Sequence, residues 1–130
     1  MAKLSEKAAH LLQDKNLANL ATIREDGTPH VSPVWVDYDG EDVLVNTAKG
    51  RAKERHLRRD PRATVEVVDQ GNPYSYVSVT GPVEMTEEGA DDHIDKLAKK
   101  YLGVDSYPNR TPEETRVIVR LHPDRVTDNA

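Results

Sequence analysis

The residues most able to do chemistry in this sequence form a basic cluster between positions 49 and 59. Six residues in this range are Lys or Arg and one is acidic, a local charge of +5 in a chain whose net charge is -5. The cluster follows the apolar run 43–45, turns at Gly50 and then enters a short helix that Asp60-Pro61 ends. The free N–H groups and the dipole of a helix N-terminus favour anions. The sequence therefore predicts an anion site at this strand-to-helix junction.

Arg51 and Lys53 are the strongest candidates for contact with a phosphate. A guanidinium offers a rigid fork of donors, and an ammonium offers a compact charge. Side chains two positions apart face different sides of a helix, but in the first turn both reach an anion on the helix axis. The alternative is a solvated basic face that pairs with the acidic remainder of the surface. We favour that alternative for Arg58 and Arg59, and the phosphate site for Arg51 and Lys53.

Two polar residues, Asn46 and Thr47, end the strand before the junction. Their short side chains are placed to bond a ring edge or a sugar-like chain, and local capping of the turn is an interpretation of nearly equal weight. The five histidines show no ligand spacing and cysteine is absent, so we expect no metal site. We name no catalytic side chain, since neither a nucleophile elbow nor a carboxylate pair stands out. This suits an enzyme whose cofactor carries the chemistry.

Length and composition limit the class of protein. A chain of 130 residues is expected to form one domain, residues 1–130, with a modest core. No signal peptide or apolar run long enough to span a bilayer is visible, so we expect a cytoplasmic protein with no membrane insertion. The net charge of -5 and the low aromatic content disfavour nucleic-acid binding.

Periodicity and turn signals predict about six strands and short helices. Asp-Gly turns at 26–27 and 39–40 predict a meander of the first three strands, and Pro33 places the second strand at an edge or bulge. Trp35 is expected in the barrel core, with a dimer contact as the alternative, and Asp91, Asp92 and Asp95 are expected on a solvated helix face. The pattern indicates a mainly β (α+β) fold, a small antiparallel barrel with flanking helices. The expected strands are 17–23, 29–38, 42–46, 62–69, 74–85 and 115–121, and the expected helices are 4–15, the segment after Gly50, and 91–102.

Several motifs together resemble a known family. These are Asp-Gly-Thr-Pro-His-Val-Ser-Pro-Val-Trp at 26–35, Val-Asn-Thr at 45–47 and the basic segment 51–62. They resemble the pyridoxamine 5'-phosphate oxidase-like split β-barrel family, and more closely its branch of flavin/deazaflavin oxidoreductases that use coenzyme F420. Asn-Pro-Tyr at 72–74 and Lys-Lys-Tyr-Leu-Gly at 99–103 also fit that branch. The resemblance implies an FMN-binding type of split barrel and a homodimer with two cofactor sites at the subunit interface.

The resemblance also implies how a cofactor lies. The ring would lie along the second and third strands, lined by residues 32–34, for which ordinary strand packing is the alternative. The phosphate would sit at the basic turn, and Tyr74 would stack from the partner chain or pack at the interface. The predicted cofactor-binding residues are Ser32, Pro33, Val34, Asn46, Thr47, Ala48, Lys49, Gly50, Arg51, Lys53 and Tyr74.

The function implied is a reductase that passes a hydride from F420 to a small conjugated organic acceptor. FMN oxidases of this family tend to have a serine where this chain has Gly50, which ranks F420 ahead of FMN. An FMN-dependent oxidoreductase and a non-catalytic F420 carrier remain as alternatives. Arg55, Arg58 and Arg59 are further candidates to hold a polyglutamate tail.

Overall fold

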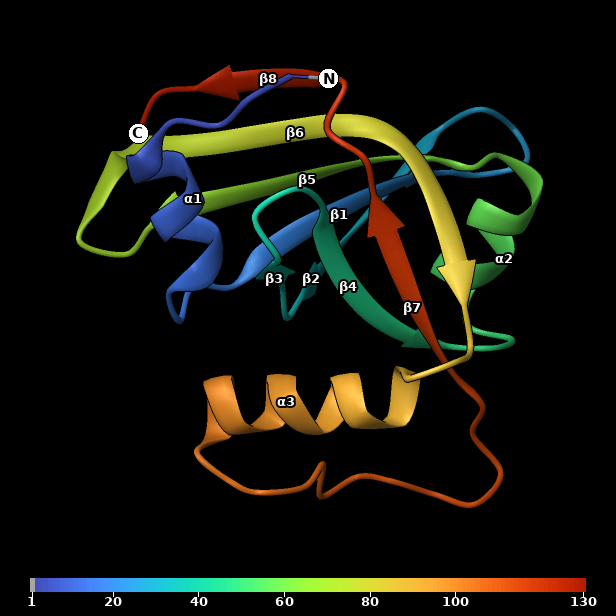
Figure 1. The fold of residues 1–130 in the computed structure, drawn as a ribbon. Coiled ribbons are helices and arrows are strands. Elements are labelled where there is room, and N and C mark those ends of the chain that lie inside the picture. The colour runs from blue at the N-terminus through green and yellow to red at the C-terminus, as the bar shows by residue number, and fades with distance from the viewer. Residues whose placement is uncertain (1) are drawn as a thin grey trace.

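The structure is a computed structural model that describes residues 2–130. Three helices and eight strands follow one another along this part of the chain (Figure 1). The elements are α1 (Glu6–Gln13), β1 (Ala18–Ile23), β2 (Pro29–Val34), β3 (Asp37–Tyr38), β4 (Val43–Ala48), α2 (Ala52–Arg59), β5 (Arg62–Asp69), β6 (Asn72–Thr86), α3 (Ala90–Leu102), β7 (Arg116–Leu121) and β8 (Arg125–Asp128).

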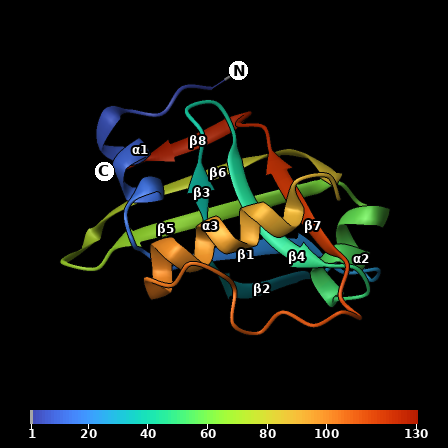
Figure 2. The same ribbon diagram turned by 60° about the horizontal axis from the view of Figure 1, so that its bottom comes forward.

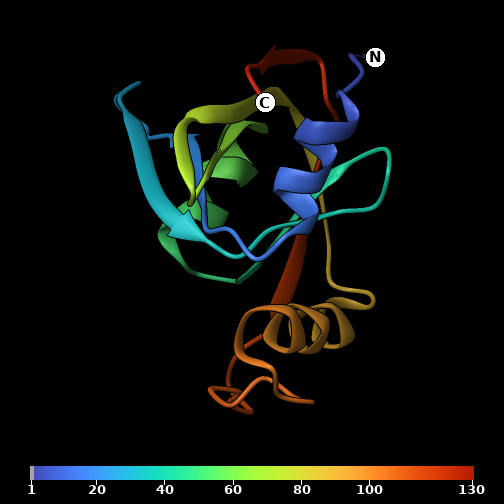
Figure 3. The ribbon, with the colours of Figure 1, turned by 90° about the vertical axis from the view of Figure 1, so that its left-hand side faces the viewer.

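The strands form one antiparallel sheet that curls on itself without closing. Its order is β2-β1-β5-β6-β7-β4-β3, and β8 pairs with β6 beside this path. The two ends of the path, β2 and β3, are neighbours in sequence but do not pair with each other. Seen from the side, the strands curl around a common interior and α3 lies outside that curl (Figure 3). The split antiparallel barrel expected from the sequence is confirmed.

The long strand β6 joins the two halves of the curl. Residues up to Pro82 pair with β5, and residues from Val83 onward pair with β7. The change follows directly after Gly81-Pro82, and a Cβ atom added to Gly81 would lie 1.9 Å from the carbonyl oxygen of His122. Glycine is therefore required here because the backbone after β7 approaches too closely for any side chain. Strand β6 bends where its pairing changes (Figure 1).

Aliphatic side chains fill the barrel. Val65, Val67, Val77 and Val79 alternate along β5 and β6 and are at most 1% exposed, as their period of two predicts. Helix α1 adds one apolar stripe, and the Ser5 hydroxyl caps it by accepting from the N–H of Ala8 at 3.1 Å. Within residues 2–130, no helix is long and apolar enough to cross a membrane.

Two expectations about the strands were wrong. The first three strands do not form a meander, because the segment expected as one strand at 29–38 is broken into β2 and β3. At the break, the N–H of Val36 donates to the Tyr101 hydroxyl at 3.2 Å and its carbonyl accepts from Lys100 at 2.6 Å. These bonds to α3 replace strand pairing. The unexpected strands β3 and β8 raise the number from about six to eight.

Helix α3 lies across β4 and β7 (Figure 2), and polar contacts fix it there. The Asn46 side chain, on β4, donates to the Ala90 carbonyl at 2.9 Å and lies 3.1 Å from Nδ1 of His93. The side-chain oxygen of Asn46, Oδ1, accepts from Arg116 Nε at 2.9 Å, which fixes the orientation of the side-chain amide. His93 Nδ1 must therefore accept a hydrogen bond, and only a neutral ring can do so.

Burial lowers the pKa of His93 from 6.5 to about 4. The unfolded chain then binds more protons than the folded chain between these values, so stability falls as the pH drops through this window. We expect the free energy of unfolding at about pH 4.5, relative to about pH 7, to fall on the order of 2–3 kcal/mol more in the wild type than in His93→Gln. Urea denaturation at the two pH values measures this difference.

The matched control is His10→Gln, because His10 is exposed on α1. It should show the acid sensitivity of the wild type. Equal acid sensitivity of His93→Gln and the wild type would show that the contact between Asn46 and His93 does not govern this titration.

Candidate functional site

An open cleft of about 450 Å³ lies between β2, the end of β4, the start of β7, the start of α2, and α3. One side of it is apolar and the other is basic. The cleft is lined by Leu17, Pro33, Val34, Trp35, Asn46, Thr47, Arg51, Lys53, Ile94, Leu97, Leu102, Tyr107, Asn109 and Arg116.

The basic side begins at the turn into α2. Gly50 has a φ of +88°, a left-handed conformation that favours glycine. Its N–H donates to the buried Glu54 carboxylate at 3.0 Å, and Arg58 binds the same carboxylate at 2.6 Å. These contacts lower the pKa of Glu54 and hold the turn in place. Arg51 is the N-cap of α2 and makes no side-chain capping bond. The first turn of α2 is therefore left without a side-chain acceptor.

Three cations, Arg51, Lys53 and Arg116, line this side of the cleft. Glu114 is the acid that pairs with both arginines, at 3.1 Å from Arg51 and 2.7 Å from Arg116. Lys53 is partly buried and has no ion pair within residues 2–130. Burial lowers the pKa of Lys53, and the charges of Arg51 and Arg116 lower it further. The cleft thus concentrates more positive than negative charge, which favours an anionic ligand.

The end of β4 places two polar side chains in the cleft. Asn46 is held by Arg116, Ala90 and His93. Thr47 is 1% exposed, and its hydroxyl has no hydrogen-bond partner among the described residues. A buried hydroxyl without a partner costs free energy. A ligand that bonds Thr47 would remove that cost.

The apolar side combines the end of β2 with α3. Pro33 and Val34 lie on an edge strand, as the proline predicts. Trp35 was expected in the barrel core, and this prediction was wrong. Its ring stacks on Tyr101 with centroids 5.4 Å apart and planes at 5°, so it belongs to a small cluster on α3. The bend after Val34 turns this ring to the cleft, where a flat ligand can pack against it.

The cleft brings together six of the eleven residues predicted to bind a cofactor. They are Pro33, Val34, Asn46, Thr47, Arg51 and Lys53.

The other five lie outside its lining. The Ser32 hydroxyl is buried without a partner in the described chain, and Ala48 is 2% exposed. Gly50 forms the turn, and Lys49 pairs with Glu87 at 2.5 Å. Tyr74 is 81% exposed, so its predicted role requires a second chain.

The remaining arginines of α2 bind other parts of the chain. Arg55 donates to the Gly50 carbonyl, Arg58 to Glu54, and Arg59 to the Ile23 carbonyl. None of the three lines the cleft. The preference for Arg58 and Arg59 as surface residues agrees with these contacts.

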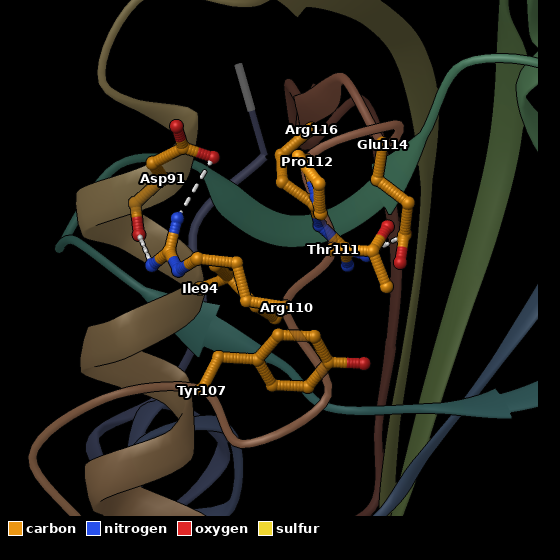
Figure 4. A pocket seen from close by; sticks show the side chains of 8 residues that line it. All are labelled: Asp91, Ile94, Tyr107, Arg110, Thr111, Pro112, Glu114 and Arg116. Atoms are coloured by element: carbon orange, nitrogen blue, oxygen red, sulfur yellow. Dashed lines mark hydrogen bonds and ion pairs between the residues drawn. The ribbon is translucent and has the colours of Figure 1, made fainter.

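Sequence reasoning missed the residues of the cleft that follow α3 in the chain. Arg116 is 6% exposed, although a charged residue at the start of an apolar strand gave no local sign of burial. Tyr107 lies in the loop 103–115, where an aromatic residue among polar ones was a usable signal. Both also line a smaller cavity of about 200 Å³ (Figure 4), which shares lining residues with the cleft.

Comparisons with known proteins agree with this architecture. The family model described as pyridoxamine 5'-phosphate oxidase matches residues 4–130. An F420H(2)-dependent biliverdin reductase from Mycobacterium tuberculosis is 23% identical over 128 residues, which cover 98% of this chain and 90% of the relative.

Two solved structures extend the comparison. An F420 reductase is 31% identical with a TM-score of 0.83, and the match covers 95% of this chain and 98% of the other. A conserved hypothetical protein from Mycobacterium tuberculosis is 28% identical with a TM-score of 0.73, and the match covers 95% and 82%. Since the family model spans almost the whole chain, this protein belongs to the pyridoxamine 5'-phosphate oxidase family.

Proposed function

We propose that this protein is an F420-dependent reductase of small conjugated organic acceptors. The observation that carries the proposal is Lys53, a partly buried cation between Arg51 and Arg116 at the start of α2. An anionic group would supply the counter-charge that this site lacks. The similarity to an F420 reductase over 95% of the chain supports F420 as the cofactor.

The residues of the cleft fit the two parts of such a cofactor. Lys53, Arg51 and the first turn of α2 would bind the phosphate, because all three offer donors toward one place. The Thr47 hydroxyl, which lacks a partner within the described chain, would bond the polar chain or the ring edge. Pro33 and Val34 would pack against the ring. The exposed apolar wall then excludes water from one face of it.

When bound in its reduced form, F420 supplies a hydride. The residues of this chain would orient the reactants and keep the site dry, which is the usual division of labour in a cofactor enzyme. Trp35 and Leu102 offer apolar surface on which a flat acceptor can lie beside the ring. Asn46, held by three partners, would remain a fixed dipole at the edge of the site.

We expect the protein to bind oxidised F420 more tightly than FMN. The basis is Gly50 at the turn, together with the excess of cations lining the cleft. Titrating the purified protein with each cofactor, and following quenching of its single tryptophan, Trp35, measures both affinities. Tight FMN binding without a response to F420 would instead favour an FMN-dependent oxidoreductase. Binding of F420 with no reduction of any acceptor would favour a carrier.

We expect Lys53→Ala to weaken F420 binding without unfolding the protein. Loss of one charged hydrogen-bond partner costs on the order of 1.5–3 kcal/mol, or about tenfold or more in affinity. Calorimetric titration measures this loss, and thermal unfolding reports on the fold.

The matched control is Lys7→Ala. Lys7 and Lys53 are each the second residue of an eight-residue helix, but Lys7 is exposed on α1 and lies outside the cleft. The affinity of Lys7→Ala for F420 should stay within about twofold of that of the wild type. If Lys53→Ala bound F420 as tightly as Lys7→Ala, the phosphate site would not lie at the start of α2.

We also propose that two chains associate to complete the site. Leu17 and Leu102 at the cleft are 55% and 50% exposed, and Tyr74 is 81% exposed outside it. A partner chain would cover these apolar groups and bring a Tyr74 to each cleft.

Sedimentation at low micromolar concentration should therefore show a homodimer. The expected mass is twice the 14.5 kDa of one chain. Substitution of Tyr74 by Ser should leave the fold intact and lower the cofactor affinity. A single species of one-chain mass would exclude a site built from two chains.

A further inference from the structure

Tyr107 lies where the cleft and the smaller cavity meet. It lines both spaces, of about 450 and 200 Å³, together with Ile94 and Arg116. Figure 4 shows its ring on the loop side of the small cavity, opposite α3. The Arg116 guanidinium lies 5.2 Å from the ring centroid. The phenol ring is thus part of the partition between two hollows of the surface.

The position of Tyr107 is set by α3. Its backbone N–H donates to the Asp95 carboxylate at 2.8 Å. Arg110, further along the same loop, donates to the same oxygen of Asp95 at 2.6 Å and pairs with Asp91 at 3.3 Å. Asp91 and Asp95 are therefore not simply solvated as expected, because they anchor the loop 103–115. Asp92, between them in sequence, is exposed.

Tyr107 also completes the aromatic wall of the cleft. Its ring meets the edge of Trp35 with centroids 6.1 Å apart and planes at 88°. Tyr101 covers one face of Trp35. The two aromatic side chains of this wall, Trp35 and Tyr107, therefore come from different segments, and the backbone of the second is anchored to α3 through Asp95.

We propose that Tyr107 is the residue that determines which acceptors the cleft admits, and that Asp95 is the residue that positions it. This inference rests on the proposed function and deepens it. The acceptor class is a planar conjugated molecule that packs along the wall of Trp35 and Tyr107. Its size is limited where the Tyr107 ring closes the way to the smaller cavity.

The consequence of removing the ring follows from the geometry. Without the Tyr107 ring, the two hollows become continuous through Ile94 and Arg116, which line both. A large acceptor gains room, whereas a small one only loses packing against the ring. The preference between a large and a small acceptor must therefore shift toward the large one.

The test compares biliverdin, a large linear tetrapyrrole, with menadione, a small bicyclic quinone. Each is titrated in its oxidised form against the purified, F420-loaded protein, and quenching of Trp35 reports binding without turnover. Tyr107→Ala should shift the ratio of the two affinities about tenfold toward biliverdin. Tyr107→Phe keeps the ring and should leave the ratio within about twofold.

Asp95 is tested in the same assay. Asp95→Ala removes the acceptor of the Tyr107 N–H and should shift the ratio in the same direction as Tyr107→Ala. Asp95→Asn keeps an oxygen for that N–H and should restore most of the wild-type ratio. Asp92→Ala, a matched change at an exposed position of the same helix, should have no effect on the ratio. Steady-state KM values for the two acceptors should follow the affinities, with kcat changing less.

An unchanged ratio in Tyr107→Ala would overturn the proposal, even if F420-dependent reduction proceeds normally. Failure of both probes to quench Trp35 in the wild type would overturn it as well. The separate titration with F420 reports on the proposed function in either case, so the two failures are distinguishable.

Discussion

The split in the barrel depends on how α3 binds the backbone between β2 and β3. The Tyr101 hydroxyl donates to the Asn16 carbonyl at 2.6 Å and accepts from the N–H of Val36. Lys100 donates to the carbonyls of Leu12 and Val36 at 2.8 and 2.6 Å. A buried backbone group without a partner is costly, so these side chains make a bend possible where a strand would otherwise continue. The bend keeps the two ends of the sheet apart and leaves the cleft open.

The charges of the cleft follow from the same arrangement. Arg116 is buried because β7 enters the sheet beside β4, and Asn46 and Glu114 supply its partners. Glu114 pairs with both Arg51 and Arg116, and within residues 2–130 Lys53 forms no ion pair. The resulting excess of positive charge is a property of the folded chain. A count of charges along the sequence places the excess of positive charge at α2 alone and does not reveal the contribution of Arg116.

The elements with strong local signals were predictable, and the contacts between distant segments were not. The strand β5 was predicted with its observed bounds, because Ala63, Val65 and Val67 alternate and a turn lies at each end. The break at Val36 was missed since its cause, the side chains of Lys100 and Tyr101, lies more than 60 residues away. Local patterns cannot report hydrogen bonds of that separation.

The residues of the candidate site fall into the same two groups, those with a local sequence signal and those placed by distant segments. Arg51 and Lys53 were predicted because a basic run after an apolar strand is visible in sequence. Tyr107 and Arg116 were missed, since their place in the cleft depends on how the loop 103–115 returns along α3. Trp35 was assigned to the barrel core because the alternation of inward and outward side chains was assumed to continue along one strand past the bend.

Gly81 has a consequence for motion in this molecule. Strand β6 belongs to both halves of the curl, and at Gly81 it touches the backbone after β7 with no space left for a side chain. Shear between the halves at this point would push these two backbones into each other, so the close approach opposes such shear. We therefore expect opening of the cleft to involve α3 and its loop, which are attached to the strands by side-chain hydrogen bonds and by the packing of Tyr101 on Trp35.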